Sequence, residues 1–402
     1  MNTGDTAWIL ASSALVLFMT PGLAFFYGGM VRTKNALAMF MKVVITMGIV
    51  TVVWMLAGFS LAFGDDIGGL IGNLKFFGLF NLGQGTTHFG LTIPDNVFMV
   101  FQMMFAIITP ALIAGAIAER MKFNAWVIFV TLWSLLVYSP MAHMVWGGGF
   151  IGNNIEALDF AGGLVVHINA GAAALAAILI LGKRKDSGAP VRPSLVLLGA
   201  GALWLGWFGF NAGSALAADG IAANAFVATQ IAAGAAAISW NMYESLIGSK
   251  PTAIGFASGA VAGLVAITPA AGFVTPFSAL LIGIAAGVLC PLAIKLKEKF
   301  NYDDSLDVVA VHLIGGIIGA LMLGLLADVA VNPNGVNGLF LGNAALFVNQ
   351  IIAIIVTIAY SFIVTFIIIK LIDMTIGIRV TEEEESIGLD ISLHGENFAA
   401  KE

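Results

Sequence analysis

Long apolar runs with almost no charge recur along nearly the whole sequence. A bilayer core requires about 20 consecutive apolar residues per helix, and 59% of the 402 residues are hydrophobic while only 10% are charged. This pattern excludes a soluble domain and predicts an all-α polytopic membrane protein. We expect eleven transmembrane helices, the eighth being the shortest, near 7–31, 40–63, 97–117, 123–143, 162–181, 194–216, 221–246, 252–267, 273–294, 307–327 and 346–372.

The basic residues predict the orientation of these helices. With the C-terminus in the cytoplasm, 16 of the 17 Lys and Arg residues fall inside and only Lys75 falls outside, as the positive-inside rule requires. We therefore expect a multi-pass cell-membrane protein with its N-terminus outside and its C-terminus in the cytoplasm. The expected outer loops are acidic and would attract cations, although acidic residues also collect wherever Lys and Arg are excluded.

The expected helices divide into two halves of five, about 7–181 and 194–327. Because five is an odd number, the second half enters the membrane from the opposite side, which is the inverted-repeat plan common in transporters. The helix at 346–372 stands outside the repeat. We therefore expect a transmembrane domain over 1–372 and a polar cytoplasmic tail over 373–402.

Two histidines lie alone in apolar spans. His167 and His312 fall in the last helix of each half, and each follows an aspartate, Asp159 by eight residues and Asp307 by five. An ionisable residue inside a membrane usually faces a pore or a partner, and an inverted pair of helices would bring two neutral imidazoles together near the midplane. Histidines packed against buried partners are the alternative. A metal site is not expected, because no third ligand and no HExxH motif accompany them.

Aromatic residues share helix faces in the same part of the sequence. Their faces attract cations, and a serine oxygen can accept an N–H group. Taken singly, each aromatic is more often packing or part of an interfacial belt, but together with the histidines they indicate an ammonium-sized guest. The residues are Trp207, Phe210 and Ser214 at i, i+3 and i+7, Phe101 and Phe105 at i, i+4, and Trp146 at the outer end of the fourth span.

Several blocks of the sequence resemble the ammonium transporter (Amt/Mep/Rh) family, on its Amt side. The blocks are DFAGGLVVHINAG (159–171) with GKR (182–184), FYGGMVR (26–32), GWFGFNAGS (206–214) and DVVAVH (307–312). The resemblance covers nearly the whole chain. It implies an eleven-helix protomer in a homotrimer, with one pore per subunit and no cofactor.

The resemblance also implies roles for individual residues. Trp146, Phe105 and Ser214 would bind ammonium at an outer site, with Phe101 nearby, and Phe105 and Phe210 would close the outer mouth. His167 and His312 would be the twin histidines of the pore. Asp159 would support the outer site structurally, beside Trp207, although a plain helix N-cap explains Asp159 equally well.

The C-terminal tail resembles the family as well, through GIRVTEEEE (377–385), GLD (388–390) and HGE (394–396). In the family this segment couples subunits and is met by a PII-type signalling protein. One departure is the position of Phe398, which follows HGE after one residue where the family usually has two. A solvated acidic terminus is the alternative interpretation of the tail.

These observations predict an ammonium transporter and neither an enzyme nor a nucleic-acid-binding protein. The protein would recruit NH4⁺ at the aromatic site, deprotonate it and conduct NH3, with or without the proton, past the two histidines. Potassium has nearly the same size but cannot shed its charge, and a bare ion in an apolar bore is costly. An ammonium sensor with little flux is the alternative. An intramembrane enzyme is disfavoured because no nucleophile accompanies the histidines.

Overall fold

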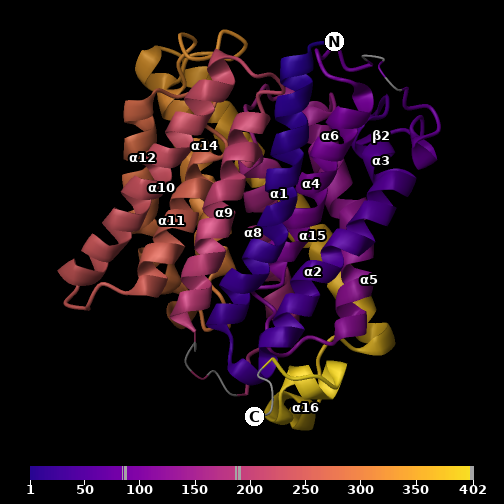
Figure 1. The fold of residues 1–402 in the computed structure, drawn as a ribbon, viewed down its shortest axis with the longest axis vertical. Helices are drawn as coiled ribbons and strands as arrows, with labels where there is room; N and C mark the ends of the chain where they lie inside the picture. Colours follow the sequence, from indigo (N-terminus) through magenta and orange to yellow (C-terminus); the bar gives the residue numbers. More distant parts are fainter. Residues whose placement is uncertain (84, 86–87, 186–187, 189–191, 399–402) are drawn as a thin grey trace.

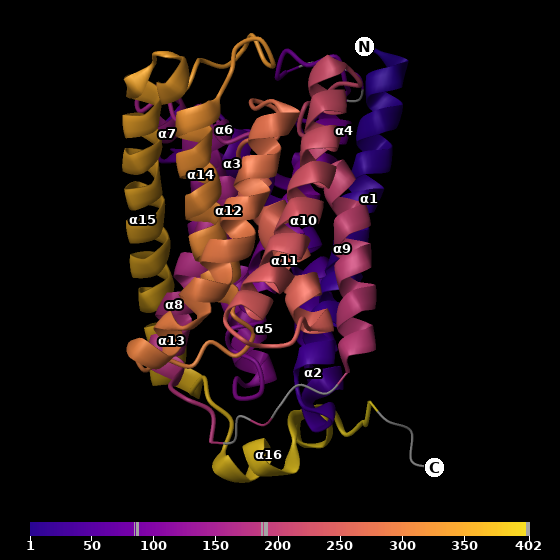
Figure 2. The ribbon, with the colours of Figure 1, turned by 90° about the vertical axis from the view of Figure 1, so that its left-hand side faces the viewer.

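The computed structural model describes residues 1–83, 85, 88–185, 188 and 192–398. It is a bundle of long helices that run roughly along one direction (Figures 1 and 2). Ten helical stretches within the described residues are long and apolar enough to cross a membrane, which confirms an all-helical, multi-pass membrane protein. They are Thr3–Met30, Thr33–Phe63, Asp95–Ile113, Phe123–Asn153, Gly163–Leu181, Pro193–Gly213, Gly220–Leu246, Pro276–Lys299, Val309–Leu326 and Ala344–Ile376.

These stretches are built from α-helices joined in places by short π-helical or 3₁₀ turns. The α-helices are α1 (Thr3–Met30), α2 (Ala36–Val53), α3 (Phe59–Phe63), α4 (Asp95–Ile113), α5 (Phe123–Trp133), α6 (Ser139–Trp146), α7 (Phe150–Asn153), α8 (Asn169–Leu181), α9 (Pro193–Gly213), α10 (Gly220–Leu246), α11 (Ala253–Ile267), α12 (Pro276–Ile294), α13 (Leu296–Lys299), α14 (Gly315–Leu326), α15 (Ala344–Ile376) and α16 (Glu382–Ile387). The π-helical turns are η2 (Trp54–Gly58), η4 (Ser134–Tyr138), η5 (Gly163–Ile168), η6 (Val309–Ile314) and η8 (Asp390–His394), and the 3₁₀ turns are η1 (Thr33–Asn35), η3 (Phe77–Leu79) and η7 (Leu339–Leu341). One small hairpin pairs β1 (Asp66–Ile67) with β2 (Ile71–Gly72), antiparallel.

The helix expected at 252–267 is α11, which is only 15 residues long. It is apolar, and α10 and α12 pack against it (Figure 2). It ends at Ile267, and the chain continues in turns through Thr268 and Pro269. Within the described residues the structure therefore has ten long spans and this short apolar helix, which lies where the shortest of the eleven predicted helices was expected.

Close helix packing depends on glycine at the contact between α1 and α9. A Cβ atom added at Gly199 would lie 2.3 Å from the backbone nitrogen of Phe26, and one added at Gly206 would lie 2.1 Å from Cγ of Met19. Small residues let transmembrane backbones approach each other in this way. These glycines therefore allow the close helix packing that stabilises the bundle.

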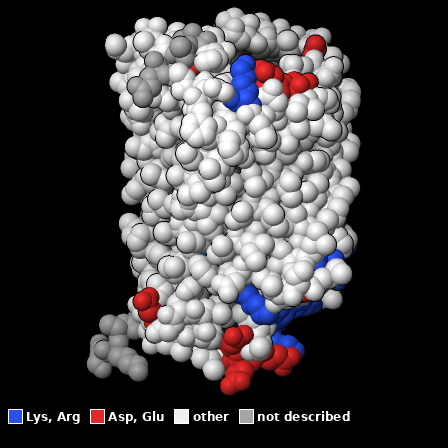
Figure 3. All heavy atoms as spheres, turned by 90° about the vertical axis from the view of Figure 1, so that its right-hand side faces the viewer, with Lys and Arg blue, Asp and Glu red and all other residues white. Residues whose placement is uncertain are grey.

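Charged residues gather at the two ends of the bundle. Figure 3 shows a wide uncharged band between them on the face drawn. Helix α1 begins at one end, and α16 lies at the other (Figure 1). At the α1 end, Lys75 forms an exposed ion pair with Asp65, with 2.9 Å between Nζ and Oδ1.

The described part of the tail packs against the end of the bundle. The Asp390 carboxylate accepts hydrogen bonds from the backbone N–H groups of Leu37 and Ala38 and so caps the start of α2, at 3.1 and 2.8 Å. The ring of Phe398 lies 4.5 Å below the Arg192 guanidinium and also contacts Phe40. Through residue 398 the tail is therefore a docked segment rather than a solvated one; residues 399–402 of the predicted tail lie outside the described part.

Candidate functional site

Two cavities lie along the bundle. The cavity at the predicted outer site, called the outer cavity below, has a volume of about 560 Å³, and Gln102, Phe105, Trp146, Asp159 and Ser214 are among the residues that line it. The inner cavity has a volume of about 400 Å³, and its lining includes Tyr27, Glu244, Lys295, Asp307 and His312. Three residues of the predicted outer site thus share one vestibule, together with Asp159.

The floor of the outer vestibule is formed by aromatic rings. The centroids of Phe105 and Phe210 lie 4.4 Å apart, and the edge of Trp146 meets Phe105 at 6.2 Å and 83°. Phe101 is fully buried and packs edge-on behind Phe105 at 4.9 Å, so it supports that ring without being among the vestibule-lining residues. The Ser214 hydroxyl donates to the Phe210 carbonyl at 2.8 Å, which leaves its oxygen lone pairs for a guest.

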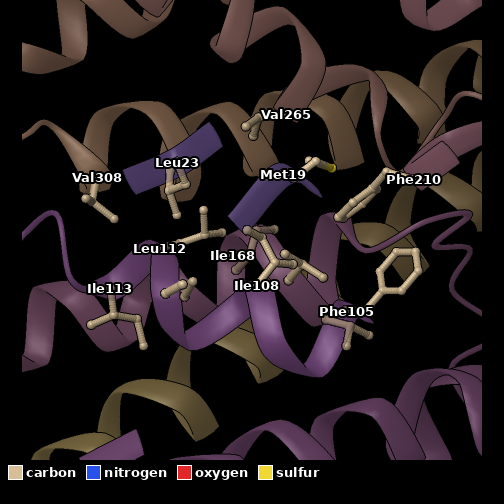
Figure 4. Close-up of a cluster of buried hydrophobic side chains, with 14 of the residues drawn as sticks. Met19, Leu23, Phe105, Ile108, Leu112, Ile113, Ile168, Phe210, Val265 and Val308 are labelled. Atoms are coloured by element: carbon tan, nitrogen blue, oxygen red, sulfur yellow. The ribbon is translucent and has the colours of Figure 1, made fainter. Parts of the chain in front are cut away.

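Below this floor the space is very narrow and almost entirely apolar. A cavity of only about 10 Å³ lies between the two vestibules. A volume of about 10–15 Å³ holds one water-sized molecule. Figure 4 shows Phe105 and Phe210 together at one end of the apolar cluster. The residues that line this narrow cavity are Met19, Leu23, Ile108, Leu112, Val166, His167, Leu203, Trp207, Phe210, Val261 and His312.

The two predicted histidines face each other in this narrow space. Nδ1 of His312 lies 3.2 Å from Nδ1 of His167, and the two rings are stacked at 5.3 Å and 23°. His167 also stacks on Trp207 and Phe210, at centroid distances of 5.5 and 6.0 Å. Each histidine sits in a π-helical turn, His167 in η5 and His312 in η6. Such turns inside α-helices are frequent at functional sites.

Asp159 connects the start of η5 with Trp146. Its carboxylate accepts four backbone hydrogen bonds at the start of η5, from residues 162, 163, 164 and 165, and its own carbonyl oxygen accepts the indole N–H of Trp146 at 2.9 Å. Burial raises the pKa of Asp159 to about 6, against the opposing effect of the four N–H groups. The structure thus shows the Asp159 carboxylate as the cap of η5 and its backbone carbonyl as the acceptor for Trp146, while its role in supporting an ammonium site stays a prediction.

A second aspartate, Asp304, contacts the π-helical turn that contains His312. It lies eight residues before His312, as Asp159 lies before His167, and its Oδ2 accepts the backbone N–H of Val309 in η6 at 2.7 Å. Burial, reinforced by the neighbouring Asp307 carboxylate, raises the pKa of Asp304 to about 7. Asp307, which the sequence pattern singled out, instead pairs with Lys297 at 2.6 Å. The equal spacing of eight residues was the signal that could have identified Asp304.

We expect Asp159→Asn to destabilise the protein by about 2 kcal/mol or more, because its amide nitrogen would leave at least one buried N–H group facing another donor. The orientation of Trp146 should be disturbed as well, since its indole N–H bonds to the same segment. Thermal unfolding in detergent measures the first effect. The matched control is Asp219→Asn at the exposed start of α10, where Asp219 caps Ile221 and Ala222 and asparagine caps equally well. Equal melting temperatures for the two variants would contradict the supporting role.

Known proteins resemble this chain over nearly its whole length. Residues 7–399 match the sequence profile described as the Ammonium Transporter Family. The chain belongs to the ammonium transporter family. It is 50% identical to an ammonium transporter of Bacillus subtilis (strain 168) over 399 residues, which cover 98% of each chain. The crystal structure of Candida albicans Mep2 matches with a TM-score of 0.90 at 35% identity, covering 96% of this chain and 88% of that one. A protein described as Sensor Amt Protein matches with a TM-score of 0.90 at 28% identity, covering 97% of this chain and 98% of the other.

The vestibule of this ammonium transporter family member also contains a polar residue that the sequence analysis missed. Gln102 is buried in α4, lines the outer cavity, and its Oε1 has no hydrogen-bond partner within the described residues. A polar amide in the middle of an apolar span, three residues before Phe105, was the available signal. The described residues contain no cluster of three or more His, Cys, Asp or Glu side chains that could hold a metal ion.

Proposed function

We propose that the protein carries ammonium across the cell membrane by capturing NH4⁺ in the outer vestibule, removing its proton and passing NH3 along His167 and His312. The observation that carries this proposal is the pair of facing histidines in a cavity of about 10 Å³ beneath two phenylalanines. A hydrated ion is much larger than this space, whereas ammonia is similar in size to the single water molecule that fits there.

Capture of the cation in the vestibule uses aromatic rings and one hydroxyl. Phe105 and Trp146 present ring surfaces to the vestibule, and a partly desolvated cation–π contact is worth about 0.5–2 kcal/mol. Because the Ser214 hydrogen is already donated to the Phe210 carbonyl, its oxygen can accept an N–H group from ammonium. Potassium gains the cation–π contact but has no N–H to donate, so the site favours ammonium.

The histidine pair provides a neutral path. In the contact between the two Nδ1 atoms one ring must donate and the other accept, so only one hydrogen lies between them. Nε2 of His167 has no partner among the described residues and borders the narrow cavity. Depending on which ring nitrogen carries the hydrogen, Nε2 can donate a hydrogen bond to a passing ammonia molecule or accept one from it. A bare cation would lose its hydration shell here without a compensating charge.

The arrangement in the membrane is part of the same proposal. We take α11 as an eleventh helix of the bundle, so that two halves of five precede α15, and the protomers as a homotrimer. The matched pairs Asp159 with His167 and Asp304 with His312 support an inverted repeat, because each aspartate lies eight residues before its histidine and bonds to a π-helical turn.

We expect cysteine-reactive, membrane-impermeant probes to label Asp219→Cys and Ala330→Cys from outside intact cells and Ser249→Cys only after the membrane is opened. All three positions are exposed, and the native Cys290 is buried, which keeps the background low. The expectation rests on the partition of basic residues. Labelling of Asp219→Cys and Ser249→Cys from the same side would contradict the proposed orientation.

The tail is proposed to regulate transport. It contacts loops from several parts of the chain: Val380 bonds to the Arg120 carbonyl, Arg379 to the Leu181 carbonyl and Leu389 to the Asn35 side chain. A segment with these contacts is well placed to transmit binding of a PII-type partner on the cytoplasmic face to the ends of the pore helices.

An ammonium sensor with little flux is the second candidate function, and the likeness to the Sensor Amt Protein favours it. Uptake of ammonium into proteoliposomes that contain the purified protein distinguishes the two. A transporter accumulates ammonium well above empty vesicles in a saturable manner. A sensor binds ammonium with uptake close to that of empty vesicles.

A further inference from the structure

His143 is a fully buried histidine that the proposed transport steps do not use. It lies on α6 about one turn before Trp146, and both of its ring nitrogens are occupied. Nδ1 lies 2.9 Å from the carbonyl oxygen of Ala62, in α3, and Nε2 lies 2.9 Å from Oδ1 of Asp66, in β1. The ring therefore bridges the last turns of α6 and the hairpin that follows α3.

The identity of these partners determines the hydrogens on the ring. A peptide carbonyl only accepts, so Nδ1 of His143 must donate to Ala62. Both oxygens of the Asp66 carboxylate already accept the backbone N–H of Gly69, at 2.8 and 3.1 Å, as an ionised carboxylate does. Nε2 must then donate to Asp66 as well. A ring that donates from both nitrogens is an imidazolium.

The bridge reaches the outer vestibule through the residues after Trp146. The backbone carbonyl of His143 accepts the N–H groups of Gly147 and Gly149, both at 3.0 Å, and the N–H of Phe150 donates to the Gly69 carbonyl at 2.9 Å. The hairpin is thus tied to this turn at two points. Contact is tight there, since a Cβ atom at Gly147 would lie 2.0 Å from the Ala62 carbonyl oxygen.

We propose that His143 is a positioning residue for ammonium capture: as an imidazolium paired with Asp66, it holds the last turn of α6 so that Trp146 faces the vestibule. The inference rests on the proposed function, because it gives Trp146 a part in binding ammonium. Loss of the bridge should loosen the capture site and raise KM. The maximal rate should change little, because the histidine pair lies beyond the phenylalanine floor.

The test compares Asp66→Asn with its neighbour Asp65→Asn in proteoliposomes. Asp65 is exposed and pairs with Lys75 in the same loop, so its variant removes an equal charge without touching the bridge. We expect Asp66→Asn to raise the KM for ammonium about fivefold or more, as the loss of a charge-assisted hydrogen bond would, with a maximal rate within about twofold of the wild type. Asp65→Asn should leave both values unchanged. Equal KM values for the two variants would overturn the positioning role.

A second measurement remains decisive if Asp66→Asn fails to fold. Nitrogen-15 NMR of histidine-labelled wild-type protein reports the protonation of each ring nitrogen, and His143→Gln identifies the signals. We expect both nitrogens of His143 to carry hydrogen. An unprotonated nitrogen would refute the imidazolium bridge. Wild-type vesicles without ammonium uptake would instead refute the proposed function, while the NMR result would still decide whether the bridge exists.

Discussion

Replacing either pore histidine by aspartate, as His167→Asp or His312→Asp, is expected to let the protein conduct potassium. In the wild type a cation in the narrow cavity finds two neutral rings and an apolar wall, and no charge compensates for its lost hydration. A fixed carboxylate supplies that charge. Each 1.4 kcal/mol removed from the barrier raises the rate about tenfold, so we expect potassium currents at least about tenfold above the wild type.

The matched controls are His167→Asn and His312→Asn, which keep a polar, neutral side chain at the same positions. They should reduce ammonium flux by disturbing the contact between the two rings, without admitting potassium. Currents in vesicles with potassium as the main cation compare all four variants. If the aspartate variants move ammonium and still exclude potassium as completely as the asparagine variants, selection by deprotonation is wrong.

Truncation after Asp373 is expected to leave a membrane-inserted protein with altered flux and no inhibition by a PII-type partner. The cut removes α16, η8 and the carboxylate of Asp390 that caps the start of α2, while every residue of the proposed pore lies before it. Flux with and without the cognate PII protein, compared between the full-length and truncated forms, measures both effects.

Point variants distinguish the loss of the contact between the tail and α2 from the loss of the whole tail. Asp390→Leu abolishes the cap of α2 and should change flux in the same direction as the truncation, because two backbone N–H groups lose their acceptor. Glu383 lies on the exposed side of α16, and its side chain forms no hydrogen bond or ion pair with the described residues. Glu383→Gln removes a charge there and should behave like the wild type. Unchanged flux and unchanged inhibition in the truncated protein would make the tail a structural appendage.

The features that could be predicted from the sequence were those carried by single residue types at fixed spacing. Apolar runs of about 20 residues located most of the long helices to within five residues, because the bilayer sets their length. The exceptions are the second span, which begins at Thr33, and the fourth, which extends to Asn153. The isolated His167 and His312 drew attention because an ionisable residue in such a run is costly. The structure brings them to within 3.2 Å, as an inverted pair of helices would.

The contacts that depend on backbone geometry could not be predicted. No residue type distinguishes a π-helical turn from the α-helix around it, so the turns at the histidines could not be predicted. The structure was therefore needed to show that Asp304, and not Asp307, bonds to η6. The residues around His143 have the sequence of an ordinary helix end. Its proposed positioning role follows from the two oxygen atoms that contact its ring in the structure.

The proposal that ammonium loses its proton before it passes the two histidines, with or without that proton crossing as well, is tested most directly by one measurement. Purified wild-type protein in proteoliposomes is given a pulse of ammonium and then an equal pulse of potassium, with uptake and current recorded in the same vesicles. The account predicts saturable ammonium uptake and, for potassium, neither uptake nor current above empty vesicles. Potassium flux comparable to ammonium flux would contradict it, because an intact cation would then be crossing the space between His167 and His312.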